Sequence, residues 1–102
     1  MYEIPINKLP SQLLGVTLEN ASYLLRLRYV NGLMLADVEI NGAAAVKGAK
    51  CLPNQKVIPY PYLTQGGNFY FYCRDNGYPD YTKFGGDHRL LFLTDGFFDR
   101  DG

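Results

Sequence analysis

Residues 13–40 read LLGVTLENASYLLRLRYVNGLMLADVEI, and this stretch predicts three antiparallel β-strands. Asn31-Gly32 is typical of a two-residue hairpin turn, which fixes how the strands on either side of it pair. This register places Leu25 opposite Val38 on an apolar face, while Arg26 meets Asp37 on the other face. The other apolar pairs expected from it are Tyr29 with Met34, Leu27 with Ala36, and Tyr23 with Ile40. We therefore expect a sheet with one buried side, because a slip of one residue would turn every side chain to the opposite face.

A polar break at residues 19–22 separates the first strand of this meander from the second. We expect it to form a four-residue loop. Pairing across such a loop extends the apolar face to a third strand, with Leu18 opposite Tyr23, Val16 opposite Leu25, and Leu14 opposite Leu27.

The rest of the chain also favours short strands. Asn41-Gly42 predicts another hairpin that leads into a strand at residues 43–46, after which residues 47–55 have the composition of a loop. Two further strands are predicted at residues 68–74 and 89–94, separated by an irregular loop at residues 75–88. Residues 1–12 are expected to form an N-terminal arm or edge strand, and residues 95–102 an acidic tail. We expect one all-β domain over residues 1–102, a small antiparallel barrel or sandwich of about seven strands built on the N-terminal meander.

Composition argues against several classes of protein. Ten basic and ten acidic residues leave a formal net charge of zero, so the long-range attraction to nucleic acid or to an anionic membrane is missing. No apolar run approaches the roughly 20 residues that span a bilayer, and we expect no membrane insertion. The N-terminus lacks the basic and apolar regions of a signal peptide, which predicts synthesis in a reducing cytoplasm with Cys51 and Cys73 unpaired.

The sequence predicts no catalytic, cofactor or metal site. His88 is the single histidine, and its Gly85-Gly86-Asp87-His88 setting is nonspecific, so we interpret it as a loop residue that leads into a strand. One histidine and two distant cysteines do not form a closely spaced set of zinc ligands. Neither glycine pair of the chain carries the lysine and serine or threonine of a nucleotide-binding loop.

Aromatic residues make up 15% of the chain and are the best candidates for a binding surface. Prolines alternate with tyrosines at residues 57–63, which favours an exposed edge or an extended rim over a central strand. With the loop at residues 76–87, this rim is the predicted partner-binding surface, comprising Pro59, Tyr60, Pro61, Tyr62, Tyr78 and Tyr81. On the strand at residues 68–74, either Phe69 and Phe71 or Tyr70 and Tyr72 should face the core. An alternative is a small tyrosine-rich module that binds carbohydrate or single-stranded nucleic acid.

Four segments, in their order and spacing, resemble the baseplate plug proteins of contractile-tailed bacteriophages. They are YEIPI at residues 2–6, YLLRLRY at residues 23–29, PYPYL at residues 59–63 and FGGDHRLLF at residues 84–92. The resemblance runs over most of residues 1–94. It implies a virion structural protein of the tail baseplate that helps plug or organise the distal hub of the tail tube and has no enzymatic activity. It also implies hub and tube proteins as partners, and a homo-oligomer in the particle is compatible with it.

Overall fold

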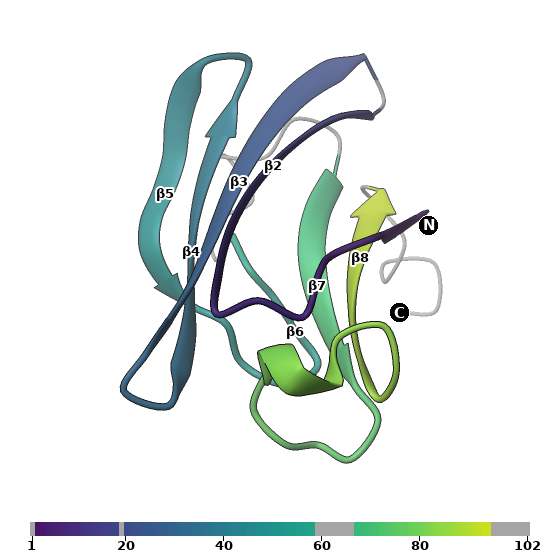
Figure 1. The fold of residues 1–102 in the computed structure, drawn as a ribbon. Coiled ribbons are helices and arrows are strands. Elements are labelled where there is room, and N and C mark those ends of the chain that lie inside the picture. The colour runs from purple at the N-terminus through teal and green to yellow at the C-terminus, as the bar shows by residue number, and fades with distance from the viewer. Residues whose placement is uncertain (1, 19, 59–66, 95–102) are drawn as a thin grey trace.

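Two four-stranded antiparallel sheets face each other across the core in this computed structural model, which describes residues 2–18, 20–58 and 67–94 (Figure 1). The first sheet follows the chain in the order β2-β3-β4-β5, with bounds Ser11–Leu18, Ala21–Val30, Leu33–Ile40 and Ala43–Lys50. The second has the order β1-β8-β7-β6, with bounds Tyr2–Ile4, His88–Thr94, Gly67–Cys73 and Gln55–Lys56. The all-β prediction is confirmed, as a sandwich with eight strands in the described part of the chain.

The predicted β3–β4 hairpin is confirmed residue by residue. Leu25 pairs with Val38 and Arg26 with Asp37, and the remaining predicted pairs follow the same register. Asn31 and Gly32 have φ angles of 51° and 83°, the left-handed conformation that a two-residue turn of this kind requires. All of the predicted inward residues of β3 are buried except Tyr29 next to the turn.

The prediction of a four-residue loop between β2 and β3 is wrong. Leu18 pairs with Ala21 and Val16 with Tyr23, so the connection has two residues and the register is shifted by two from the prediction. Asn20 makes this tight turn possible, because its φ of 65° is a left-handed conformation that asparagine tolerates better than most residues. A shift of two residues keeps each side chain on its predicted face, so the apolar face survives the error.

Strand β5 is longer than the predicted strand at residues 43–46. It continues to Lys50 because register shifts along its pairing with β4 absorb the irregularity that looked like a loop. Gly48 lies in this region at φ 64°. Its N–H donates to Asp37 Oδ1 at 2.6 Å, and Arg28 Nη2 pairs with the same oxygen at 3.2 Å. Asp37 therefore lies opposite Arg26 in the ladder but pairs with Arg28.

Aromatic rings join the two sheets. Phe69 and Phe71 of β7 are completely buried whereas Tyr72 is 41% exposed, so the phenylalanines are the core-facing set. Tyr23 of the first sheet contacts Phe69 and Phe92 of the second edge-on, with ring centroids 5.4 and 5.2 Å apart. Gly67 is required beside this cluster, because a Cβ there would lie 2.4 Å from the Phe92 ring.

Within the described residues β1 lies at the edge of the second sheet and pairs with β8, while β2 begins at Ser11, inside the predicted arm. The predicted rim residues Pro59, Tyr60, Pro61 and Tyr62 and the acidic tail at residues 95–102 lie outside the described residues. Among the residues that are described, no helix is long and apolar enough to cross a membrane.

Replacing Leu25 with alanine should lower the free energy of unfolding by about 2–5 kcal/mol, because Leu25 has no exposed surface and the change leaves a cavity in the core. Arg26→Ala is the matched control on the opposite face of the same strand and should be nearly neutral. Urea denaturation of both variants measures the difference. Equal, small losses would contradict the observed register.

Candidate partner-binding surface

The loop between β7 and β8 is organised around His88, the first residue of β8. Its side chain is 1% exposed. The ring Nδ1 accepts a hydrogen bond from the Asp80 N–H at 3.0 Å, which assigns the ring proton to Nε2. Nε2 then donates to Asp75 Oδ1 at 2.8 Å. The sequence interpreted His88 as a loop residue that leads into a strand, whereas it is the first residue of β8, and both its ring nitrogens tie the two ends of the loop together.

Asp75 collects three hydrogen bonds at the start of the loop. Besides His88, Lys83 Nζ donates to its Oδ2 at 2.9 Å and the Gly77 N–H to its Oδ1 at 2.9 Å. These bonds hold the pKa of Asp75 well below its usual range, with Lys83 contributing most and His88 next. The hydrogen bond and the attraction between Lys83 and Asp75 also raise the pKa of Lys83.

A single 3-10 turn, η2 at Tyr81–Lys83, closes the loop. Asp80 caps it, because its Oδ1 accepts from both the backbone N–H and the hydroxyl of Thr82 at 2.9 and 2.8 Å. These bonds lower the pKa of Asp80. Phe84 follows and is buried, stacked on Phe71 with centroids 5.8 Å apart. Polar bonds at one end and an apolar anchor at the other thus hold a segment with little regular structure.

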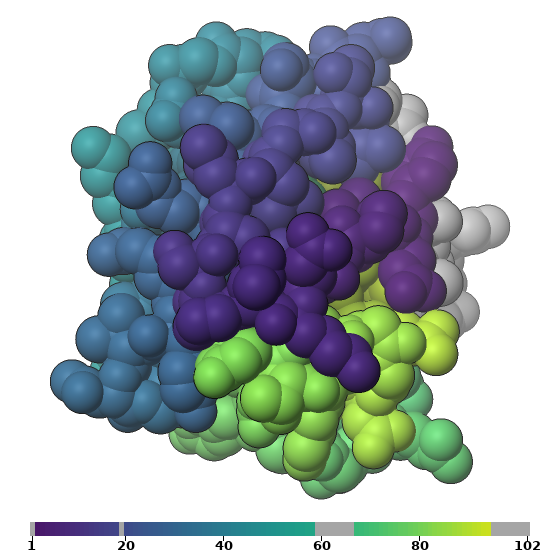
Figure 2. Space-filling model, viewed as in Figure 1, coloured from purple at the N-terminus to yellow at the C-terminus, as the bar shows by residue number. Residues whose placement is uncertain are grey.

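This loop presents tyrosines at one end of the sandwich. Tyr78 is 54% exposed, and the half-buried Tyr81 packs edge-on against Tyr29 of β3 with centroids 5.2 Å apart. We call Tyr29, Tyr78 and Tyr81 the tyrosine end. In the space-filling view, light green residues from this loop lie against dark purple and blue residues of the first sheet (Figure 2). Leu9–Pro10 flank the same place, because the Pro10 carbonyl accepts from the Tyr29 N–H at 2.7 Å.

The sequence predicted Tyr78 and Tyr81 as partner-binding residues, and the structure places Tyr29, which was not among them, beside Tyr81. The alternation of apolar and polar residues along the strand predicted that Tyr29 faces the core opposite Met34. Tyr29 does pair with Met34. Tyr29 is nevertheless 37% exposed, because it lies at the end of the strand where the core is no longer covered. The position of Tyr29, two residues before the Asn31-Gly32 turn, was the sequence signal that could have indicated its exposure.

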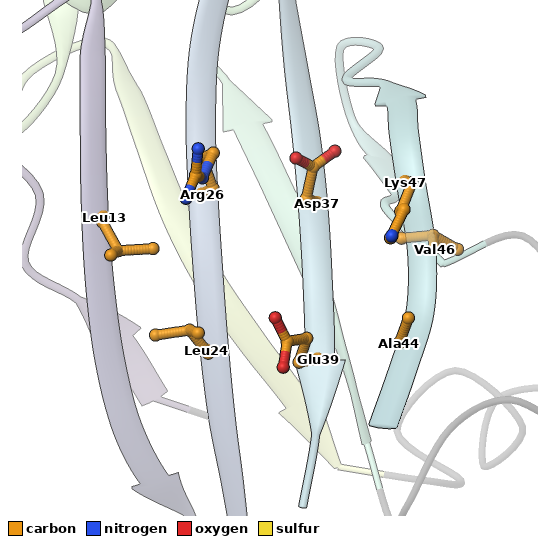
Figure 3. A pocket seen from close by; sticks show the side chains of 8 residues that line it. All are labelled: Leu13, Leu24, Arg26, Asp37, Glu39, Ala44, Val46 and Lys47. Carbon is orange, nitrogen blue, oxygen red and sulfur yellow. The ribbon is translucent and has the colours of Figure 1, made fainter. Parts of the chain in front are cut away.

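A second surface feature lies on the outer face of the first sheet. It is a shallow groove of about 260 Å³ lined by Leu13, Leu24, Arg26, Asp37, Glu39, Ala44, Val46 and Lys47 (Figure 3). The groove combines exposed leucines with charges of both signs. Arg26, Glu39 and Lys47 form no ion pair within the described residues. Such a mixture suits contact with another protein better than it suits a small anion or cation.

The reactive side chains of the described residues are poorly placed for chemistry. Cys51 and Cys73 are free and buried, and burial raises their pKa values to about 12 and about 11. Such thiols stay protonated at neutral pH and are weak nucleophiles. The part of the chain that the structure describes holds no group of three or more His, Cys, Asp or Glu side chains that could bind a metal ion.

Comparison with known protein families identifies the chain's family. The family model described as "Cyanophage baseplate Pam3 plug gp18" matches residues 1–95, a range that runs from β1 through β8. No curated protein matches the chain significantly.

Replacing His88 with alanine should lower the free energy of unfolding by about 1–3 kcal/mol, because the Asp80 N–H loses its acceptor inside the fold. Arg89→Ala is the matched control at the next position. Arg89 contacts Glu3 through side chains that are 44% and 48% exposed, so its loss should cost little. Comparable losses for the two variants in urea denaturation would contradict the role assigned to His88.

Acid should destabilise the protein in part through Asp75. Its pKa is lowered in the folded chain, so below about pH 4, the ordinary aspartate pKa, the unfolded state binds a proton that the folded state does not. The stabilisation is therefore complete above that pH and declines as the pH falls further. Asp75→Asn should flatten the fall in melting temperature between about pH 4 and pH 2. An acid profile identical to that of the unsubstituted protein would count against this assignment.

Proposed function

The chain belongs to the cyanophage baseplate Pam3 plug gp18 family, and we propose that it is a non-enzymatic component that plugs or organises the distal hub of a phage tail tube. Its partners in this proposal are other hub and tube proteins of the baseplate. The observation that carries the proposal is the extent of the family match, which includes both sheets and the loop that bears Tyr78 and Tyr81.

The chemistry of the site supports a structural role. A general base needs a ring nitrogen that can accept a proton from a substrate, but the Nδ1 of His88 already accepts from Asp80 and its Nε2 faces Asp75. The two thiols are buried and protonated at neutral pH. Each of these groups is therefore engaged in holding the fold.

The tyrosine end, together with the predicted rim at Pro59, Tyr60, Pro61 and Tyr62, is the partner surface that we propose. Tyrosine offers a large contact area with few rotatable bonds, and it is enriched where proteins bind one another. The hydrogen bonds of His88 and Asp75 fix the loop before any partner arrives, so little conformational entropy is lost on binding. An exposed tyrosine on a fixed loop is a good anchor.

Replacing Tyr78 with alanine, or Tyr60 and Tyr62 together, should leave the protein folded but reduce its incorporation into tails. Anchors of this kind contribute about 2 kcal/mol or more to binding. Incorporation can be measured by mass spectrometry of purified tails from phage that lack the gene and receive the variant in trans. Tyr72→Ala is the matched control, since Tyr72 is 41% exposed on β7 and is not part of the tyrosine end.

Circular dichroism and melting temperature must be measured on the same variants. A lowered melting temperature with normal incorporation of the folded fraction would mean that these tyrosines only cover the end of the sandwich. Reduced incorporation at an unchanged melting temperature supports the proposed surface.

A further inference from the structure

Strand β2 presents an open edge of the first sheet. Its neighbour on one side is β3, and the sheet order places no strand on its other side in the described part of the chain. Because the Pro10 carbonyl bonds to Tyr29, the antiparallel alternation directs the even-numbered residues of β2 toward β3. The N–H and C=O groups of the odd-numbered residues Ser11, Leu13, Gly15 and Thr17 therefore point away from the sheet.

This edge lacks the features that keep sheet edges from pairing. Strand β2 has eight residues in an unbroken register and contains no charged residue and no proline. The other described edges are protected: β5 has register shifts and carries Lys47 and Lys50, while β1 and β6 have three and two residues. In Figure 2 the dark purple residues of this region lie at the surface of the visible face.

Gly15 is unexplained by the chain's own structure. Its φ angle is not left-handed, and a Cβ at this position would come no closer than 3.8 Å to any atom, the Tyr23 carbonyl oxygen. A glycine inside a strand costs about 0.5–1 kcal/mol relative to alanine. Such a residue often marks a place where another backbone or side chain approaches closely.

Two exposed leucines flank this glycine on the outer face. Leu13 is 57% exposed and Leu24, which pairs with Gly15, is 39% exposed. Both side chains extend into the space over the gap between β2 and β3 (Figure 3). Leu13 along the strand and Leu24 across from Gly15 thus form an exposed apolar strip near the open edge.

We propose that β2 pairs with β2 of a second copy of this chain, antiparallel about a two-fold axis at Leu14. The two four-stranded sheets then become one continuous sheet. In this register, Ser11 lies opposite Thr17 of the second copy and Leu13 opposite Gly15. Every open N–H and C=O group of the odd-numbered residues finds a partner, and no charges meet along the shared edge.

The register follows from the sequence of β2. Leu13 covers Gly15 of the second copy and reaches its Leu24, and the symmetry repeats this contact on the other side of the axis. A shift of one residue would pair inward-facing with outward-facing positions. A shift of two residues one way would place the glycines opposite each other, and a shift the other way would place Gly15 opposite Ser11, so neither lets Leu13 cover Gly15. This pairing of two copies does not rest on the proposed baseplate role.

Sedimentation equilibrium of the full chain at micromolar to near-millimolar concentration tests the proposal. The mass should rise with concentration from 11.5 kDa toward twice that value. Leu13→Lys and Thr17→Lys should each raise the dissociation constant at least about tenfold, because an edge lysine opposes strand pairing. Ala43→Lys on the exposed start of β5, outside the groove of Figure 3, is the matched control and should leave the dimer unchanged.

A cross-link tests the register. The residues of a hydrogen-bonded antiparallel pair have Cα atoms about 5.5 Å apart, which a disulfide can span. A mixture of Ser11→Cys and Thr17→Cys chains should form a covalent dimer under mild oxidation. Each variant alone, which keeps the buried Cys51 and Cys73, should not. A wild-type chain that stays monomeric over the whole range, a dimer that survives Leu13→Lys, or no cross-link in the mixture would overturn the proposal. If the chain is monomeric, the open edge of β2 would instead be available to a strand of another protein.

Discussion

Left-handed backbone at three asparagines sets the register of the first sheet, which positions the ring of Tyr23 in the core. Asn20, Asn31 and Asn41 begin or end two-residue turns with φ angles of 65°, 51° and 52°. The turns also support one another, because the Ser22 N–H donates to Asn41 Oδ1 at 2.9 Å and the Asn41 N–H to the Ser22 carbonyl at 2.7 Å. Since side chains alternate along a strand, fixing these turns decides which face of the sheet is apolar. The ring of Tyr23 then reaches Phe69 and Phe92, and the second sheet packs where the first one directs it.

Local rules were sufficient at the Asn31-Gly32 turn, but they missed the two-residue turn between β2 and β3, and they also failed where a distant side chain decides. Asn31-Gly32 specifies its hairpin alone, so the whole β3–β4 ladder could be predicted. Residues 47–50 looked like a loop because Gly48 breaks the alternation, yet Asp37 on the neighbouring strand accepts its N–H and keeps β5 in the sheet. The hydrogen bonds of His88 were not predicted for the same reason, since its partners Asp75 and Asp80 lie up to 13 residues away along a loop without periodicity. Hydrogen bonds between irregular segments leave no regular pattern in the sequence.

The same cluster explains how an irregular loop can serve as a contact surface. Residues that bind a partner must be exposed, and exposed loops usually lose conformational entropy when they bind. Here the polar bonds to His88 and the buried ring of Phe84 hold the loop from inside, so Tyr78 is exposed without being loosely attached. The stability of the loop and its capacity for contact therefore come from different residues. A tyrosine can change with the partner while the supporting histidine and aspartates remain.

The two proposed contact surfaces occupy different parts of one small sandwich. At the tyrosine end, side chains provide the surface, and a partner is selected by shape. Along β2 the backbone provides it, and the absence of charge, proline and any side chain at Gly15 selects a strand. The two surfaces come from different elements, because the open edge belongs to β2 whereas the tyrosines come from β3 and the β7–β8 loop. If both proposals hold, the chain pairs with a copy of itself through backbone groups of β2, and its tyrosines stay available for other proteins.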